Sequence, residues 1–84
     1  MSTGEKWSTD NIYLAAAIIC FIGIEPVLEI QNNWVKFIFP VNAKLHDALQ
    51  KFMGGEAYNL SEFSRQVKRL RALMLTMRQQ VQHG

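Results

Sequence analysis

The fold is decided by one stretch of the sequence, Val27-Leu28-Glu29-Ile30-Gln31-Asn32-Asn33-Trp34-Val35-Lys36-Phe37-Ile38-Phe39. Its two halves are rich in β-branched and aromatic residues, which favour strands. The halves are separated by two asparagines, and asparagine tolerates the positive φ that a tight two-residue turn requires. The stretch therefore predicts an antiparallel hairpin over residues 27–39.

Pairing across this turn divides the hairpin residues between two faces. The apolar face holds Leu28, Ile30, Val35, Phe37 and Phe39, whereas the other face has a Glu29–Lys36 pair flanked by Trp34, Val27 and Ile38. A two-stranded sheet with open edges and an apolar outer face is marginal in water. We expect either a second copy of the chain to cover Trp34 and Ile38, or the first helix or the segment around Trp7 to do so.

Two helices are predicted after the hairpin. Pro40 ends the second strand, and Asn42 is a suitable cap for a helix over residues 43–53 that Gly54 and Gly55 end. Asn59, followed three residues later by Glu62, resembles a capping box and predicts the start of a third helix over residues 60–81.

Before the hairpin, residues 1–7 are mostly polar, with Trp7 as the only large anchor, and are expected to be frayed. A helix is predicted over residues 8–22, capped by Ser8 or Thr9 and ended by Gly23. The 84 residues then form one domain of the α+β class, in the order α-β-β-α-α, with a two-stranded antiparallel hairpin packed against three helices and a long C-terminal helix.

The third helix carries apolar residues at alternating spacings of four and three, as coiled-coil helices do: Phe63, Val67, Leu70, Met74, Met77 and Val81. We call these six residues the apolar ladder. The ladder either packs entirely in the core or continues into an interface with a partner. A helix of about 30 Å is longer than this domain can cover. We expect the part up to Leu70 to be core and the part from Met74 onward to face a partner. The predicted partner interface comprises Leu73, Met74, Met77, Val81, Trp34 and Ile38.

The charge of the chain is unevenly distributed. Residues 1–62 have a net charge of −3, whereas residues 63–84 contain five basic and no acidic residues: Arg65, Lys68, Arg69, Arg71 and Arg78. One interpretation is a solvated helix face whose aliphatic stems shelter apolar surface. The other is contact with the phosphates of a nucleic acid. No aromatic residues interleave with these cations.

The sequence offers little for catalysis or cofactor binding. Cys20 is the single cysteine and lies in an apolar run, where burial raises a thiol pKa and makes the group inert. His46, Asp47 and Lys51 fit a solvated helix face better than an acid–base group. We found no pattern typical of a metal site or a phosphate-binding loop. We expect no enzymatic activity, no cofactor and no small-molecule substrate.

The apolar run from Ile12 to Ile24 is thirteen residues long, which is short for a membrane span. It is also not followed by the small residues of a signal-peptide cleavage site. A lone cysteine is compatible with a reducing compartment. The sequence therefore predicts a soluble cytoplasmic protein that does not enter a membrane.

Three segments resemble a small domain family of bacterial and mobile-element genomes that has no assigned function. They are Thr9-Asp10 with Tyr13-Leu14-Ala15-Ala16, Val35-Lys36-Phe37-Ile38-Phe39, and Gly55-Glu56 before the helix near Phe63. The resemblance covers about residues 8–75 and implies the order of elements. It supplies no functional residues.

These observations favour a non-enzymatic protein-interaction module, either a homodimer or a subunit that docks on another protein. The resemblance to a mobile-element family implies a regulator or inhibitor of a host or phage factor. The alternative is a nucleic-acid-binding accessory protein that uses the basic third helix. Binding of a DNA or RNA probe with an affinity that falls steeply between low and moderate salt is expected only for the alternative.

Overall fold

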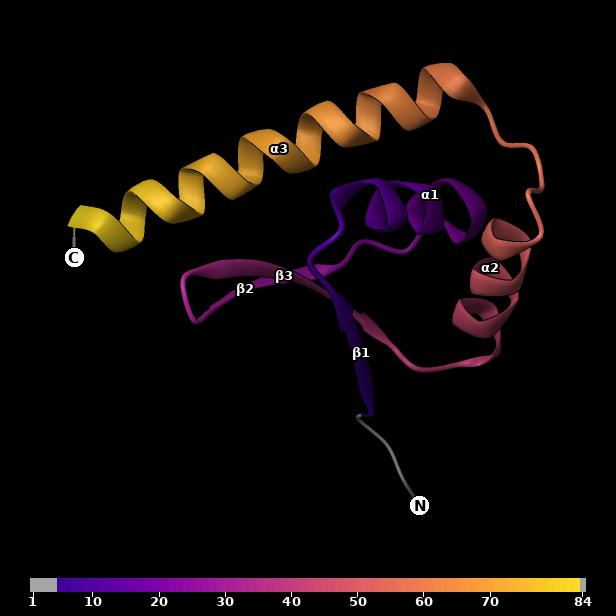
Figure 1. The fold of residues 1–84 in the computed structure, drawn as a ribbon, viewed down its shortest axis with the longest axis horizontal. Helices are drawn as coiled ribbons and strands as arrows, with labels where there is room; N and C mark the ends of the chain where they lie inside the picture. The colour runs from indigo at the N-terminus through magenta and orange to yellow at the C-terminus, as the bar shows by residue number, and fades with distance from the viewer. Residues whose placement is uncertain (1–4, 84) are drawn as a thin grey trace.

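The computed structural model describes residues 5–83 of the chain, with side chains over residues 5–79. Three helices and three strands follow in the order β1 (Lys6–Thr9), α1 (Ile12–Ile22), β2 (Val27–Gln31), β3 (Trp34–Pro40), α2 (Ala43–Met53) and α3 (Leu60–His83). The predicted α+β class and the long C-terminal helix are confirmed (Figure 1). The order of elements is β-α-β-β-α-α, because one strand precedes the first helix.

Strand β1 is the main difference from the sequence prediction. Lys6–Thr9 had been assigned to a frayed terminus and to the start of a helix, but this segment pairs antiparallel with β3 and makes β3 the central strand of three. Trp7 packs on Phe39 with the ring centroids 6.2 Å apart, which fixes the strand on the core side. The part of the frayed-terminus prediction that concerns residues 1–4 lies outside the described residues.

Helix α1 begins later than predicted because its cap is Asn11. The Asn11 side chain accepts hydrogen bonds from the backbone N–H groups of Tyr13 and Leu14, at 3.0 and 3.2 Å. Thr9 instead accepts a hydrogen bond from the Asn11 N–H at 3.1 Å. The helix ends at Gly23, whose φ of 71° lies in the left-handed region that glycine adopts without strain.

The hairpin has the predicted register. Gln31 pairs with Trp34 across the turn, and Glu29 pairs with Lys36. Asn32 and Asn33 have φ values of 54° and 68°, the positive values that a primed two-residue turn needs. The alternation of the pleat therefore places Val35, Phe37 and Phe39 on the core side, where all three are buried.

The core lies between the inner face of the sheet and the three helices. Its buried members come from the three helices and the central strand: Ala15, Ala16, Ile18 and Ile19 from α1, Phe37 and Phe39 from β3, Leu45 and Ala48 from α2, and Val67 and Leu70 from α3. The small alanines of α1 let neighbouring elements approach closely. Figure 1 shows α3 running along α1, with its yellow end continuing past the turn of the hairpin.

Candidate functional site

The first part of α3 packs into the core of the domain. Val67 and Leu70 are buried, and Phe63 and Met74 pack against the core cluster from its edge. The prediction that the ladder is core up to Leu70 is therefore confirmed. Met74 was assigned to the partner interface, and its side chain also packs against the core cluster, which reaches one turn further along α3 than expected.

The part of α3 from Leu73 onward has more exposed apolar surface. Leu75 is 55% exposed and Leu73 is 37% exposed, whereas Met77 is half-buried. At about 100° per residue, Leu73 and Leu75 lie on opposite flanks of the helix. The side chain of Val81, also predicted to contact a partner, lies outside the described residues.

Trp34 and Ile38 lie on the face of the sheet that points away from the core. Trp34 is 63% exposed beside the turn, but Ile38 is only 8% exposed. Ile38 lies between Ser8 on β1 and Val27 on β2, so neighbouring strands cover it without a second copy. The segment around Trp7 was one of the three alternatives predicted to cover this face. It does so through its polar residues, since Trp7 itself points inward onto Phe39.

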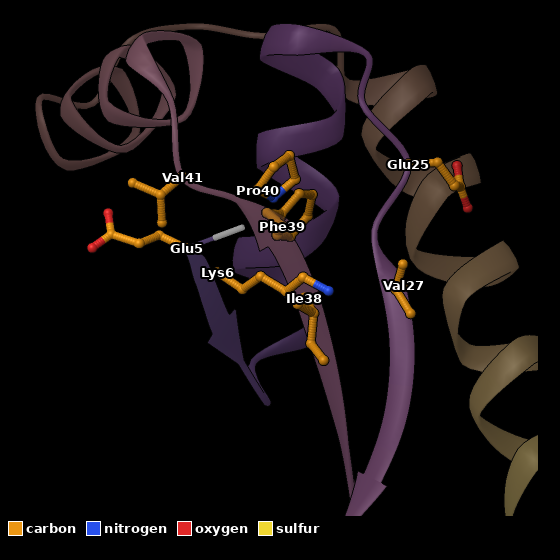
Figure 2. Close-up of a pocket in the computed structure, with 8 residues that line it drawn as sticks. All are labelled: Glu5, Lys6, Glu25, Val27, Ile38, Phe39, Pro40 and Val41. Carbon is orange, nitrogen blue, oxygen red and sulfur yellow. The ribbon is translucent and has the colours of Figure 1, made fainter. Parts of the chain in front are cut away.

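The same outer face contains a cavity of about 270 Å³. Figure 2 shows its lining, with Lys6, Ile38 and Val27 on three neighbouring strands and with Glu5 and Glu25 at separate edges of the hollow. Pockets for small ligands usually enclose about 300–1,000 Å³ and gather a few polar groups onto one point. The small volume and the separated charges make this cavity a weak candidate for a ligand site.

Two of the five cations of α3 are bound within the chain. Arg69 makes a bidentate ion pair with Glu25, with nitrogen–oxygen distances of 2.6 and 2.9 Å, and also donates to Gln66. Arg65 pairs with Glu62 one turn earlier on α3. Both cations therefore stabilise the domain, which weakens the prediction that all five bind a nucleic acid.

The other three cations form a stripe with Leu75. Lys68, Arg71, Leu75 and Arg78 follow each other at spacings of three, four and three, which keeps them on one side of α3. We call these four residues the cationic stripe. None of its cations forms an ion pair with a described residue, and Arg71 donates a hydrogen bond of 3.3 Å to the hydroxyl of Tyr13.

Two ionisable groups near the start of α3 have shifted pKa values. Hydrogen bonds from Gln66 and Arg65 hold the pKa of Glu62 below its usual value. Burial, together with the charge of Glu62, raises the pKa of the Cys20 thiol. The raised pKa was expected from the sequence, and it makes Cys20 a poor nucleophile at neutral pH.

A hollow of about 400 Å³ beside the start of α3 is lined by Asn59, Ser61, Glu62 and Arg65. The Asn59 side chain caps the helix by accepting the Glu62 N–H at 2.9 Å, and the Glu62 carboxylate accepts from Arg65 and Gln66. The side chains of Asn59, Glu62 and Arg65 therefore already form hydrogen bonds within the start of α3. In the part of the chain that the structure describes, three or more His, Cys, Asp or Glu residues nowhere gather as metal ligands would.

The described helices were also compared with the requirements of a bilayer span. None of them in residues 5–83 combines the necessary length with enough apolar character.

Comparisons of the chain with protein-family models, curated proteins and solved structures found no match. The resemblance to a bacterial and mobile-element family therefore stays a prediction.

The structure adds two residues that the sequence did not single out. Tyr13 joins the cationic stripe through Arg71, and Glu25 neutralises Arg69 from a position 44 residues away in the chain. The spacing of Leu75 from Arg71 and Arg78 in the sequence places it on the same side of α3 as these cations. No sequence pattern could reveal the two long-range contacts, because they depend on how α3 packs across α1 and the start of β2.

Proposed function

We propose that the chain is a non-enzymatic protein-interaction module whose contact surface is centred on Leu75 and includes the part of α3 beyond Met74. One observation carries the proposal. Met74 is the last described residue of α3 that packs against the core cluster, yet the helix continues to His83. A helix that extends beyond its core gains little from the domain, and its exposed Leu75 is favourable to bury against another protein.

A different protein fits this surface better than a second copy does. The described part of α3 contains one carboxylate, Glu62, and it is paired with Arg65. Two copies packed through this part of α3 would place Arg71 and Arg78 of each chain near like charges. Self-association remains the second arrangement to test. If the protein sediments as a monomer at high micromolar concentration, the homodimer expected from the sequence is wrong.

Nucleic-acid binding is the alternative function. It is supported by Lys68, Arg71 and Arg78, which form no ion pair with a described residue. It is weakened by the intrachain contacts of Arg65 and Arg69. The expectation that the chain regulates a host or phage factor stays a prediction.

The experiment uses a photo-crosslinking amino acid in place of Leu75, with the same amino acid in place of Met53 as a control. Met53 is 84% exposed on α2, so the control offers an equally accessible apolar site away from α3. A protein captured at position 75 in the native host is purified and titrated against the wild type and Leu75→Glu. We expect specific capture at position 75, and we expect Leu75→Glu to abolish binding.

The proposal fails if the crosslinker at position 75 captures no more protein than the crosslinker at position 53 does. It also fails if the captured protein binds Leu75→Glu as well as it binds the wild type. Oligonucleotide binding that is steeply salt-dependent, in a chain with no protein partner at position 75, would favour the alternative function.

A further inference from the structure

The cationic stripe lies beside the ladder that α3 directs at the core. At about 3.6 residues per turn, the stripe is rotated by roughly 100° from the line of Phe63, Leu70 and Met77. It is therefore a flank of the helix, neither buried in the core nor pointing directly away from it. Lys68, Arg71, Leu75 and Arg78 are all exposed.

Helix α1 contributes an aromatic ring next to this stripe. Tyr13 accepts the hydrogen bond from Arg71 through its hydroxyl, and its ring stacks on Phe63 with the centroids 6.4 Å apart. More than half of the Tyr13 side chain surface nevertheless remains exposed. The stripe and Tyr13 therefore form one surface that combines three cations with two apolar groups.

The positive charge of this surface determines the sign of the charge that its partner carries. Lys68, Arg71 and Arg78 have no carboxylate partner among the described residues, and residues 63–84 contain no acidic residue. Unpaired cations in a row attract acidic groups and repel basic ones over about one Debye length, roughly 8–10 Å. The partner is expected to be acidic.

Leu75 determines the kind of acidic partner. It lies between Arg71 and Arg78, and a phosphate backbone in contact with those arginines would leave its side chain in water. An anionic bilayer needs a broad apolar face, but α3 uses that face for the core, and Leu73 is on the opposite flank. A protein helix satisfies both requirements, since it can present carboxylates and apolar side chains on one side.

We infer that the cationic stripe, together with Tyr13, binds an acidic amphipathic helix of another protein. This inference rests on the proposed function and names the class of partner. Carboxylates of the partner helix pair with Lys68, Arg71 and Arg78, and its apolar residues cover Leu75 and the Tyr13 ring. The stripe from residue 68 to residue 78 is about 15 Å long, so the interface is small and the complex transient.

The test uses a synthetic helical peptide of about three heptads, with leucine at the a and d positions and glutamate at e and g. A matched peptide carries glutamine in place of every glutamate, and a third carries lysine. Binding to the full chain is measured by fluorescence anisotropy. We expect the glutamate peptide to bind about tenfold more tightly than the glutamine peptide, with the preference shrinking as salt is raised.

Charge reversal on the chain provides the matched control. We expect Arg71→Glu/Arg78→Glu to lose its affinity for the glutamate peptide and to bind the lysine peptide more tightly than the wild type does. Lys44→Glu/Lys51→Glu on α2 changes the net charge of the chain by the same amount and is expected to retain the wild-type preference. Circular dichroism confirms that both variants are folded, so that a lost preference reports the surface and not unfolding.

The inference is overturned if the chain binds the glutamate and glutamine peptides with equal affinity. It is also overturned if the two double variants change the affinity for the glutamate peptide equally, or if Arg71→Glu/Arg78→Glu binds the lysine peptide no more tightly than the wild type does. Preferential binding of a duplex or single-stranded oligonucleotide through Arg71 and Arg78 would overturn it in favour of a nucleic acid. Preferential binding of phosphatidylserine vesicles would do so in favour of a membrane. If capture at position 75 succeeds while the peptide preference is absent, the proposed function stands and this inference alone fails.

Discussion

The two parts of α3 differ in what their side chains contact. Up to Met74, the apolar ladder packs on the core, and Arg65 and Arg69 are held by Glu62 and Glu25. Beyond Met74, Leu75 is exposed, and Arg78 has no ion pair within the described residues. A continuous heptad pattern therefore serves two purposes. Changes to the core-facing residues of the first part should alter stability, whereas changes to the cationic stripe should alter binding.

The largest effect is expected from Leu70→Ala, in the middle of the first part. Leu70 is fully buried, and removing a buried leucine side chain costs about 2–5 kcal/mol through lost transfer energy and the cavity left behind. Chemical denaturation followed by circular dichroism measures the change. A loss below about 0.5 kcal/mol would mean that α3 is not part of the core.

Met74→Ala locates the boundary between the two parts. Met74 is half-buried against the core cluster, so we expect a loss of about 1–2 kcal/mol, less than for a fully buried methionine. Denaturation of this variant beside Leu70→Ala provides the comparison. A loss as large as that of Leu70→Ala would move the boundary further along α3.

The ion pair between Arg69 and Glu25 ties the first part of α3 to the start of β2. Both side chains are partly exposed, so a double-mutant cycle with Arg69→Ala and Glu25→Ala should give a coupling energy of about 0.2–1 kcal/mol. The coupling should decrease as salt is raised. A coupling of zero at low salt would show that the contact does not hold the two elements together.

Glu62 gives the first part of α3 a small dependence on pH. Its pKa is lowered in the folded chain by hydrogen bonds from Gln66 and Arg65, so the stability it contributes is present above its unfolded pKa of about 4.3. That stability is lost as the pH falls through the lower folded pKa. Denaturation from pH 7 to pH 3 should show the difference between wild type and Glu62→Gln narrowing in acid, and a constant difference would contradict the assignment.

The hairpin was predictable in detail because pattern and turn chemistry agree. The alternation from Val27 to Phe39 and the two asparagines determine the register, which the structure reproduces pair by pair. Strand β1 was not predictable because Lys6-Trp7-Ser8-Thr9 carries one large apolar residue. The segment becomes a strand only because β3 offers it a free edge and Phe39 packs against Trp7.

The candidate site was only partly predictable for a similar reason. The spacing of the cations and Leu75 is visible in the sequence, but the division of the five cations into bound and unbound groups is not. That division depends on Glu25 and Tyr13, which reach α3 through tertiary packing. Trp34 and Ile38 were predicted on the outer face of the hairpin and lie there, but only Trp34 stays exposed, because Ile38 is covered by strands on both sides.

The smallest effect on stability and the most direct test of the account belong to Leu75→Glu. Because Leu75 is exposed, the free energy of unfolding should change by no more than about 0.5 kcal/mol. The measurement is the affinity of the glutamate peptide for Leu75→Glu, with Met53→Glu as the matched control. We expect Leu75→Glu to lose its affinity for the glutamate peptide and Met53→Glu to bind it as the wild type does. Equal binding by both variants would contradict the claim that the distal part of α3 is a contact surface.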